Sequence, residues 1–199
     1  MRRVSLALVH HPIRGRHGET LTTTLTNLDL HDLARCARTY GLQALYIVHP
    51  LSSQRLLAER ILRHWTEGPG GKRIPDRAEA LSVVRIVSHL ETITAGVEGA
   101  SRNDGAEGAP RKVLGTSTEL WTTAAVAQGD ITTFSEARRR LAEAGPDVVI
   151  VFGTGWGLTA ETLDAAAVRL EPIRAAADTG YNHLSVRAAC AITLDRLLG

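Results

Sequence analysis

The chain has 199 residues, of which 44% are hydrophobic and 22% are charged, and this composition excludes disordered and fibrous proteins. A chain of this length can bury a core as one domain over residues 1–199 without disulfides or metal ions. Its two cysteines are too few for a disulfide framework or a zinc site, so we expect a reducing, cytoplasmic environment. No apolar run approaches the roughly 20 residues of a membrane helix, and we expect no membrane partner.

The net charge of +2 is unevenly distributed. Residues 1–90 carry 13 basic and 7 acidic side chains, whereas residues 91–199 carry 10 basic and 14 acidic ones. Arginine supplies 21 of the 23 basic residues, and arginine binds phosphate through two parallel hydrogen bonds. Codon usage is the alternative explanation for arginine over lysine. The arginine-rich first half is compatible with binding to nucleic acid.

The hydrophobic pattern predicts strands that alternate with helices. Capping-box spacing marks helix starts at Thr26 with Asp29 and at Thr133 with Glu136, and Gly41 ends the first of these helices. Two segments, 68–73 and 96–110, are predicted to be loops, the second a mobile surface loop. The predicted elements are strands at Val4–Val9, 42–48, 83–87, 113–116, 148–152 and 168–173, and helices at 26–41, 52–65, 76–81, 133–144, 159–163 and 182–198, with one more helix opening at 88–91.

This alternation implies an α/β fold with a mostly parallel sheet flanked by helices. Ligands of such sheets bind at the carboxyl ends of the strands. The segments that follow the predicted strands are therefore candidates for the functional site. They are His10 with His11, His49 with Pro50, Thr116 with Ser117, residues 153–157, and the segment after Ile173.

Three glycines occupy alternate positions in residues 153–157, directly after a predicted strand. Their missing side chains let backbone amides approach a ligand closely. The spacing matches neither the dinucleotide fingerprint nor a phosphate loop, and a tight structural turn is the alternative. Trp156 lies between two of these glycines, and we predict that it lines a pocket.

Polar residues concentrate near two predicted helix starts. Residues 181–187 include Tyr, Asn, His, Ser and Arg, more than a helix cap needs, although capping by Asn182 or Ser185 is the alternative. Residues 27–38 combine Asn, Asp, His and Arg, for which a solvated, ion-paired helix surface is the alternative. We predict no metal site, because no second cluster has ligand spacing, and without a nucleophile elbow we assign no Ser-His-Asp triad.

Three segments resemble, in order, the three motifs of the SPOUT-class RNA methyltransferases. They read DLHDLARCARTYG at 29–41, VFGTGWGL at 151–158 and NHLSVRAA at 182–189. The chain is most similar to a subfamily of predicted S-adenosylmethionine-dependent RNA methyltransferases, on the segments LVHHP at 8–12, TNLDLHD at 26–32 and YNHLSVR at 181–187. The resemblance covers essentially the whole chain, and the last motif is the most specific.

The resemblance implies a C-terminal segment threaded into a deep trefoil knot, with S-adenosylmethionine bound against the knot loops. It also implies a homodimer in which Arg35 reaches the cofactor of the partner subunit. The implied cofactor-binding residues are Thr116, Ser117, Phe152, Gly153, Thr154, Gly155, Trp156, Gly157, Leu158, Ile173, Gly180, Tyr181, Asn182, Leu184 and Ser185.

Methyl transfer requires an acceptor that is held in line with the methyl group and loses a proton. Asp29 or His31 is the predicted proton acceptor, and Arg35 is predicted to orient the acceptor or its phosphate, or to act as the base. Many members of the class have Asn followed by Gly at the helix start, where this chain has Asp29 and Leu30. The positioning role of that Asn therefore passes to Asn27, to Asp29 or to neither.

The predicted function is methylation of a nucleotide of tRNA or rRNA. The chain shows no separate RNA-binding domain, so we expect the first half to capture RNA, with contributions from Arg14, Arg16, Lys72 and Arg73. The alternative is a knotted module that binds RNA or a protein partner without catalysis. A Rossmann-type oxidoreductase is a weaker alternative, because the dinucleotide fingerprint is missing.

Overall fold

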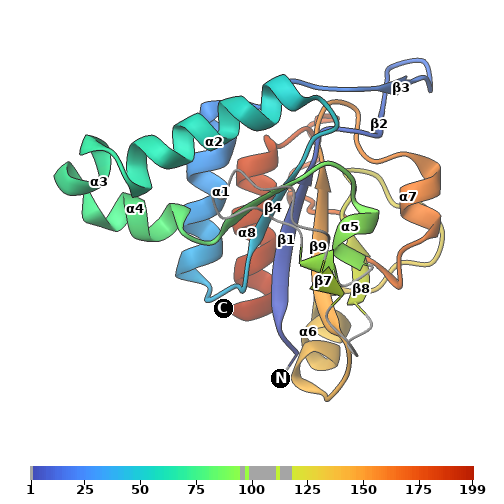
Figure 1. Ribbon diagram of the computed structural model, residues 1–199. Coiled ribbons are helices and arrows are strands. Elements are labelled where there is room, and N and C mark those ends of the chain that lie inside the picture. Colours follow the sequence, from blue (N-terminus) through green and yellow to red (C-terminus); the bar gives the residue numbers. More distant parts are fainter. Residues whose placement is uncertain (1, 95–96, 99–110, 113–117) are drawn as a thin grey trace.

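The computed structural model describes residues 2–94, 97–98, 111–112 and 118–199. A six-stranded sheet lies at its centre, in the order β10-β8-β9-β1-β4-β5, and all neighbouring strands are parallel (Figure 1). These strands are β1 (Val4–Val9), β4 (Leu45–Val48), β5 (Val84–Val87), β8 (Thr118–Thr122), β9 (Asp147–Gly153) and β10 (Val168–Arg169). Two short antiparallel pairs lie outside the sheet: β2 (Ile13–Arg14) with β3 (Thr20–Leu21), and β6 (Val97–Glu98) with β7 (Arg111–Lys112).

The strand order differs from that of the dinucleotide-binding fold. Numbered along the chain, the six strands of the sheet run 3-2-1-5-4-6 from β5 to β10, whereas the dinucleotide-binding order is 3-2-1-4-5-6. Strand β9 therefore pairs directly with β1, and β8 lies outside it. This order contradicts the Rossmann-type alternative.

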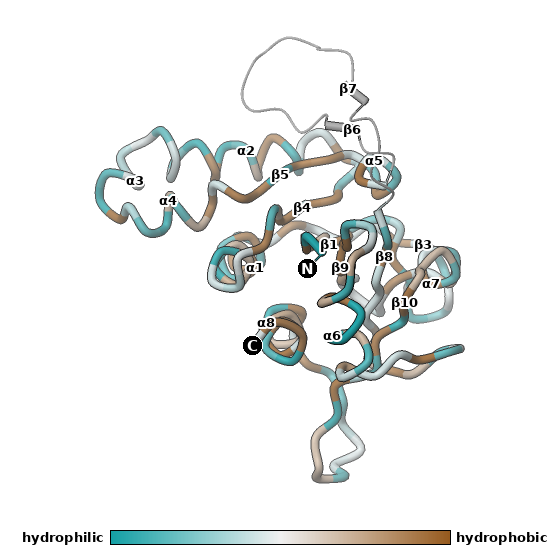
Figure 2. The backbone as a smooth tube through the Cα atoms, turned by 90° about the horizontal axis from the view of Figure 1, so that it is seen from below, coloured by the Kyte–Doolittle hydropathy of each residue, from teal (hydrophilic) through white to brown (hydrophobic). Residues whose placement is uncertain are grey.

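Helices cover both faces of the sheet (Figure 2). One face carries α1 (Asn27–Thr39), α6 (Phe134–Ala142) and α8 (Val186–Leu198), and the other carries α5 (Glu91–Thr94) and α7 (Ala160–Asp164). A helical arm packs against α1 and extends beyond the β5 edge; it consists of α2 (Ser52–Thr66), α3 (Pro69–Arg73) and α4 (Pro75–Leu81). The predicted α/β architecture is confirmed.

Strand β1 is buried on both faces, as its continuous apolar run predicts. Leu6 and Leu8 belong to the core cluster that includes residues of α1, α6 and α8. Ala7 and Val9 belong to the second cluster, on the opposite face. Both faces of the central strand are therefore occupied, and ligands are left with the edge at which the strands end.

The two helix starts predicted at Thr26 and Thr133 are confirmed by their hydrogen bonds. The Thr26 hydroxyl accepts from the Asp29 amide at 3.1 Å, and Thr133 forms a complete capping box with Glu136. The last helix begins later than predicted, because Ser185 caps it by accepting from the Ala188 amide at 3.2 Å. Residues 182–184 consequently precede the helix and are available to line a site.

Three predicted elements differ in the structure. The loop prediction for 68–73 was wrong, since α3 forms there with Pro69 in its first turn, where the missing N–H costs no hydrogen bond. The last strand ends at Arg169 rather than at 173, before Pro172, which lacks the N–H that a strand partner needs. The predicted strand 113–116 lies outside the described residues, and the sequence reading missed β8, which begins just after it.

The segment between β10 and α8 runs beside the loop that follows β8. Leu170 forms a parallel bridge with Thr132, and the Asn182 side-chain amide donates to the Ala125 carbonyl at 2.9 Å. The knot that the resemblance implies would thread here, and it stays a prediction.

The predicted mobile loop 96–110 lies outside the described residues except for 97–98. In the described ranges, no helix combines the length and the apolar character that crossing a bilayer requires.

Candidate cofactor cavity

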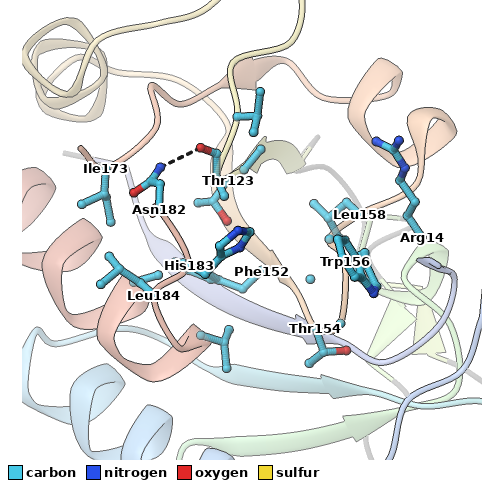
Figure 3. A pocket seen from close by; sticks show the side chains of 18 of the residues that line it. Arg14, Thr123, Phe152, Thr154, Trp156, Leu158, Ile173, Asn182, His183 and Leu184 are labelled. Atoms are coloured by element: carbon cyan, nitrogen blue, oxygen red, sulfur yellow. Dashed lines mark hydrogen bonds between the residues drawn. The ribbon is translucent and has the colours of Figure 1, made fainter. Parts of the chain in front are cut away.

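A cavity of about 760 Å³ opens at the carboxyl ends of β8 and β9 (Figure 3). Its lining includes residues 123–126 after β8, residues 152–158 at and after the end of β9, and residues 182–186 before and at the start of α8. The size is that of a small-molecule site, and the position is the edge at which parallel sheets bind ligands. The predicted binding edge and this cavity coincide.

The glycine-rich loop after β9 forms one wall of the cavity. The Thr154 amide donates to the Val9 carbonyl at 3.3 Å, and the Gly157 amide donates back to the Thr154 carbonyl at 3.0 Å, which closes a tight turn. Gly155 has φ +56° and Gly157 has φ +101°, conformations that L residues adopt only at a cost. The glycines are therefore required by the turn, and the turn shapes the cavity wall.

The segment before α8 forms the facing wall. Ile173, Asn182, Leu184 and Ser185 all line the cavity, and Figure 3 shows the first three on the side opposite Trp156. The hydrogen bond from Asn182 to the loop after β8 holds this wall in place. Ser185 fits both predictions made for it, helix capping and a place in the cofactor site, because it caps α8 and also lines the cavity.

Two of the predicted cofactor residues do not line the cavity. Gly180 and Tyr181 are not among the lining residues, and Tyr181 is 72% exposed, with its ring edge-on to His183. Thr116 and Ser117 lie outside the described residues. The remaining predicted cofactor residues line the cavity: Phe152, Gly153, Thr154, Gly155, Trp156, Gly157, Leu158, Ile173, Asn182, Leu184 and Ser185.

Sequence reasoning missed the third wall, residues 123–126 with Gln128. These residues follow β8, whose sequence TELWT has the β-branched and aromatic residues of a strand. Recognition of that strand would have placed its carboxyl end beside that of β9 and included the following loop in the site. Asn182 bonds to this loop through the Ala125 carbonyl.

Arg187 joins the first and last motifs. Its guanidinium donates to Asp29 at 2.8 Å and lies 3.3 Å from the Asp32 carboxylate. Asp29 also accepts from the Thr26 hydroxyl at 2.6 Å, so this predicted proton acceptor is buried and occupied by two donors. In this structure Asp29 holds α1 and α8 together.

His31 packs against the helical arm. Its ring meets the Trp65 ring edge-on, with centroids 5.6 Å apart, and Arg77 lies over the same indole at 4.5 Å from its centroid. Burial lowers the pKa of His31, and the nearby Arg77 lowers it further. His31 does not line the cavity, so its predicted role as proton acceptor has no support in the geometry of one subunit.

Asn27 and Arg35 are exposed on α1, and neither lines the cavity. Among the described residues, Arg35 forms no ion pair. All four predicted catalytic residues thus lie outside the lining of the cavity.

Two buried histidines lie at the carboxyl ends of β1 and β4, behind the cavity loop. The rings of His10 and His49 stack with centroids 5.3 Å apart. His10 Nδ1 bonds to the Thr23 hydroxyl at 3.0 Å, and that hydroxyl lies 2.5 Å from the Thr154 hydroxyl of the glycine-rich loop. Burial, with a smaller contribution from His49, lowers the pKa of His10 to about 4, so His10 is neutral at physiological pH.

One consistent pattern of donation runs from Nδ1–H of His10 to the Thr23 hydroxyl, from Thr23 to the Thr154 hydroxyl, and from Thr154 to the Val9 carbonyl at 3.2 Å. The Nε2 atom of His10 is buried without a hydrogen-bond partner.

No group of three or more His, Cys, Asp or Glu side chains that could hold a metal ion occurs in the described part of the chain.

The β2–β3 hairpin borders the mouth of the cavity. The Arg14 amide donates to the Gly157 carbonyl at 2.9 Å, and Ile13 bridges to Leu158. The Arg16 guanidinium lies over Trp156, 6.0 Å from the ring centroid. The hairpin therefore belongs to the same structural unit as the glycine-rich loop.

The fold and the cavity define an α/β protein that binds a small molecule at the carboxyl edge of its sheet, between a glycine-rich loop and the segment before the last helix. The model of a family described as SAM-dependent RNA methyltransferase matches residues 3–199. The chain belongs to this family. The predicted resemblance and the cofactor class, S-adenosylmethionine, are confirmed at the level of the family.

Two relatives are named tRNA (guanine-N(1)-)-methyltransferase. The one from Nitratidesulfovibrio vulgaris is 44% identical and the one from Oleidesulfovibrio alaskensis 41% identical, each over 198 residues, or 100% of this chain. The chain spans only 42% of the length of either relative. A SpoU methyltransferase from Streptomyces viridochromogenes, solved with AdoMet, aligns with a TM-score of 0.54 at 14% identity, over 99% of this chain and 57% of its own. This similarity shows the fold alone.

Proposed function

We propose that the chain transfers a methyl group from S-adenosylmethionine to a nucleotide of RNA. The observation that carries the proposal is the cavity itself, which two of the three family motifs build at the carboxyl edge of the parallel sheet. The third motif supports it through the bond between Asp29 and Arg187. Family membership over residues 3–199 agrees with this reading.

The lining suits an adenosine-like ligand with a short aliphatic chain. Its apolar side chains include Phe152, Leu158, Ile173 and Leu184, which would hold a purine and a methylene chain. Glu171, the one acidic residue of the described lining, accepts from the Phe134 amide at 2.7 Å. When bound, S-adenosylmethionine supplies an electrophilic methyl group on a positively charged sulfur. The protein's residues have to hold the acceptor in line and accept its proton.

The acceptor nucleotide is not assigned by the names of the relatives. More than half of each named tRNA methyltransferase lies outside the region that this chain matches, so the guanine-N1 activity describes a longer protein. We propose tRNA as the first substrate to test and rRNA as the second, on the strength of these names and of the arginine-rich first half.

We further propose a homodimer in which Arg35 acts at the partner's cavity. Its support is the exposure of Arg35 and its absence from the cavity of its own subunit. Asn27 is exposed in the first turn of α1, about two turns before Arg35, and we propose that it faces the same partner. A cytoplasmic location, where tRNA and rRNA are found, is part of the same proposal.

The test is transfer of label from tritiated S-adenosylmethionine to RNA purified from cells that lack the protein. We expect saturable incorporation into tRNA or rRNA, and no further incorporation into RNA from cells that contain the protein. Absence of incorporation into either RNA pool, with the cofactor bound, would contradict the enzyme and favour the non-catalytic RNA- or partner-binding module.

A further inference from the structure

Trp156 is exposed in a way that packing does not explain. It is 59% exposed, whereas Trp121 is fully buried and Trp65, on α2 of the helical arm, packs against His31 of α1. The tight turn of the glycine-rich loop places its indole at the cavity mouth rather than in the core. A large aromatic face held in solvent beside a cavity is typical of a binding surface.

Arg14 and Arg16 line the same cavity as Trp156, and the backbone fixes this arrangement. Arg14 is bonded to the glycine-rich loop through the Gly157 carbonyl, and the Arg16 guanidinium lies over the indole of Trp156. Both arginines are exposed, and neither forms an ion pair with a described residue. The nearest acid in the hairpin sequence, Glu19, accepts from the His17 amide at 2.8 Å.

The cavity has two ends of different chemistry. Figure 3 shows Trp156 and Arg14 at one end and Ile173, Asn182 and Leu184 at the other. The second end combines apolar walls with the structural hydrogen bond of Asn182, and it suits the cofactor. The first end combines an open aromatic face with two cations that form no ion pair within the described ranges. It therefore suits an anionic, aromatic ligand.

We propose that Trp156, Arg14 and Arg16 form the acceptor subsite, which takes an unstacked nucleotide of single-stranded RNA. The base stacks on the exposed face of Trp156, and the arginines bind the adjoining phosphates. Aromatic rings bind any base through its π face, and guanidinium groups bind phosphate through paired hydrogen bonds. The proposal rests on the proposed function for its orientation toward the methyl donor. It moves Trp156 from the predicted cofactor set to the substrate set.

The test measures RNA binding without the cofactor. The probe is a fluorescein-labelled single-stranded RNA of about 12 nucleotides, with the duplex of the same sequence for comparison. We expect the single strand to bind more tightly than the duplex. Trp156→Ala should weaken binding of the single strand by about tenfold or more, and Trp156→Phe should recover most of it, because a smaller ring still stacks.

The charge contribution is tested with Arg16→Ala and a matched control. Arg16→Ala should weaken RNA binding and reduce the slope of log affinity against log salt by about 1, which is the loss of one phosphate contact. Arg139→Ala removes one exposed positive charge from α6, and we expect the RNA affinity of this variant to equal that of the wild type. S-adenosylmethionine affinity, measured by calorimetry, should be unchanged in all of these variants.

Two outcomes would overturn the acceptor subsite. One is wild-type RNA affinity in both Trp156→Ala and Arg16→Ala; the other is a loss of cofactor affinity in Trp156→Ala while RNA affinity stays constant. Failure of the proposed function looks different. If the wild type binds RNA through these residues but transfers no methyl group, the nucleotide site stands and the methyltransferase activity does not.

Discussion

Arg187 and Asp29 are separated by 158 positions in the sequence and bonded at 2.8 Å in the fold. The pair joins the first turn of α8 to the first turn of α1. Because residues 182–186 line the cavity just before Arg187, this bond sets the position of one cavity wall. A residue predicted to act on protons thus has a structural role that its sequence neighbourhood does not reveal.

Loss of this pair should destabilise the protein. Arg187→Ala leaves the Asp29 carboxylate, whose side chain is 9% exposed, without its cation, and we expect unfolding to become easier by about 2 kcal/mol. In urea denaturation, the double variant Arg187→Ala with Asp29→Asn should lose less than the sum of the two single losses. Arg3→Ala is the control, because its partner Asp147 is more exposed, and we expect a clearly smaller loss of stability. Equal losses in Arg187→Ala and Arg3→Ala would contradict a structural role for Arg187.

Stability should depend on the protonation of His10. Its pKa is about 4 in the folded protein, mainly because of burial, and about 6.5 in the unfolded chain. Between these values the unfolded chain binds the proton and the folded protein does not. The contribution of His10 to the free energy of unfolding is therefore fully present above pH 6.5. It falls by about 3 kcal/mol as the pH drops to 4.

His10→Asn isolates this dependence, because the amide of Asn can still donate to Thr23 but does not titrate. The free energy of unfolding of the variant should fall less between pH 6.5 and pH 4 than that of the wild type, as followed by denaturant titration at each pH. The remaining decline in the variant includes His49, whose pKa burial also lowers. Parallel pH profiles for the wild type and His10→Asn would refute the assignment to His10.

A side chain at Gly155 should weaken cofactor binding in addition to straining the backbone. An added Cβ at Gly155, which has φ +56°, would lie 3.3 Å from Ile13 and 3.4 Å from Thr23. Gly41 has a similar φ of +68° at the end of α1, with open space around an added Cβ. Both Gly155→Ala and Gly41→Ala should lose about 1 kcal/mol of stability. Only Gly155→Ala should also weaken S-adenosylmethionine binding in calorimetry, and equal cofactor affinities in the two variants would count against the loop as the binding wall.

A mixing experiment tests whether Arg35 acts across subunits. Arg35→Ala and Gly155→Asp should each be inactive, the first without the arginine and the second without a functional cavity. Co-expressed as a mixed dimer, they form one intact site, from the cavity of the Arg35→Ala subunit and Arg35 of the Gly155→Asp subunit. Methyl transfer should therefore return to a measurable fraction of the wild-type rate. Persistent inactivity of a verified mixed dimer would mean that Arg35 acts within its own subunit, or not at all.

The sequence predicts the cofactor wall more completely than the catalytic residues, for a physical reason. Glycine spacing and strand ends are local signals, so residues 152–158 and the segment before α8 are found without tertiary information. The bond from Arg187 to Asp29 and the contact of His31 with Trp65 depend on how helices pack. No periodicity in the sequence encodes these contacts between helices. The loop after β8 was missed because the sequence reading contained no strand at Thr118–Thr122.

Calorimetric titration of S-adenosylmethionine into the wild-type protein tests the central claim most directly. The cavity between the glycine-rich loop and the segment before α8 predicts saturable binding of one cofactor molecule per chain, lost in Gly155→Asp and retained in Gly41→Ala. Absence of heat and of competition at millimolar cofactor, in protein shown to be folded, would contradict the assignment of this cavity to S-adenosylmethionine.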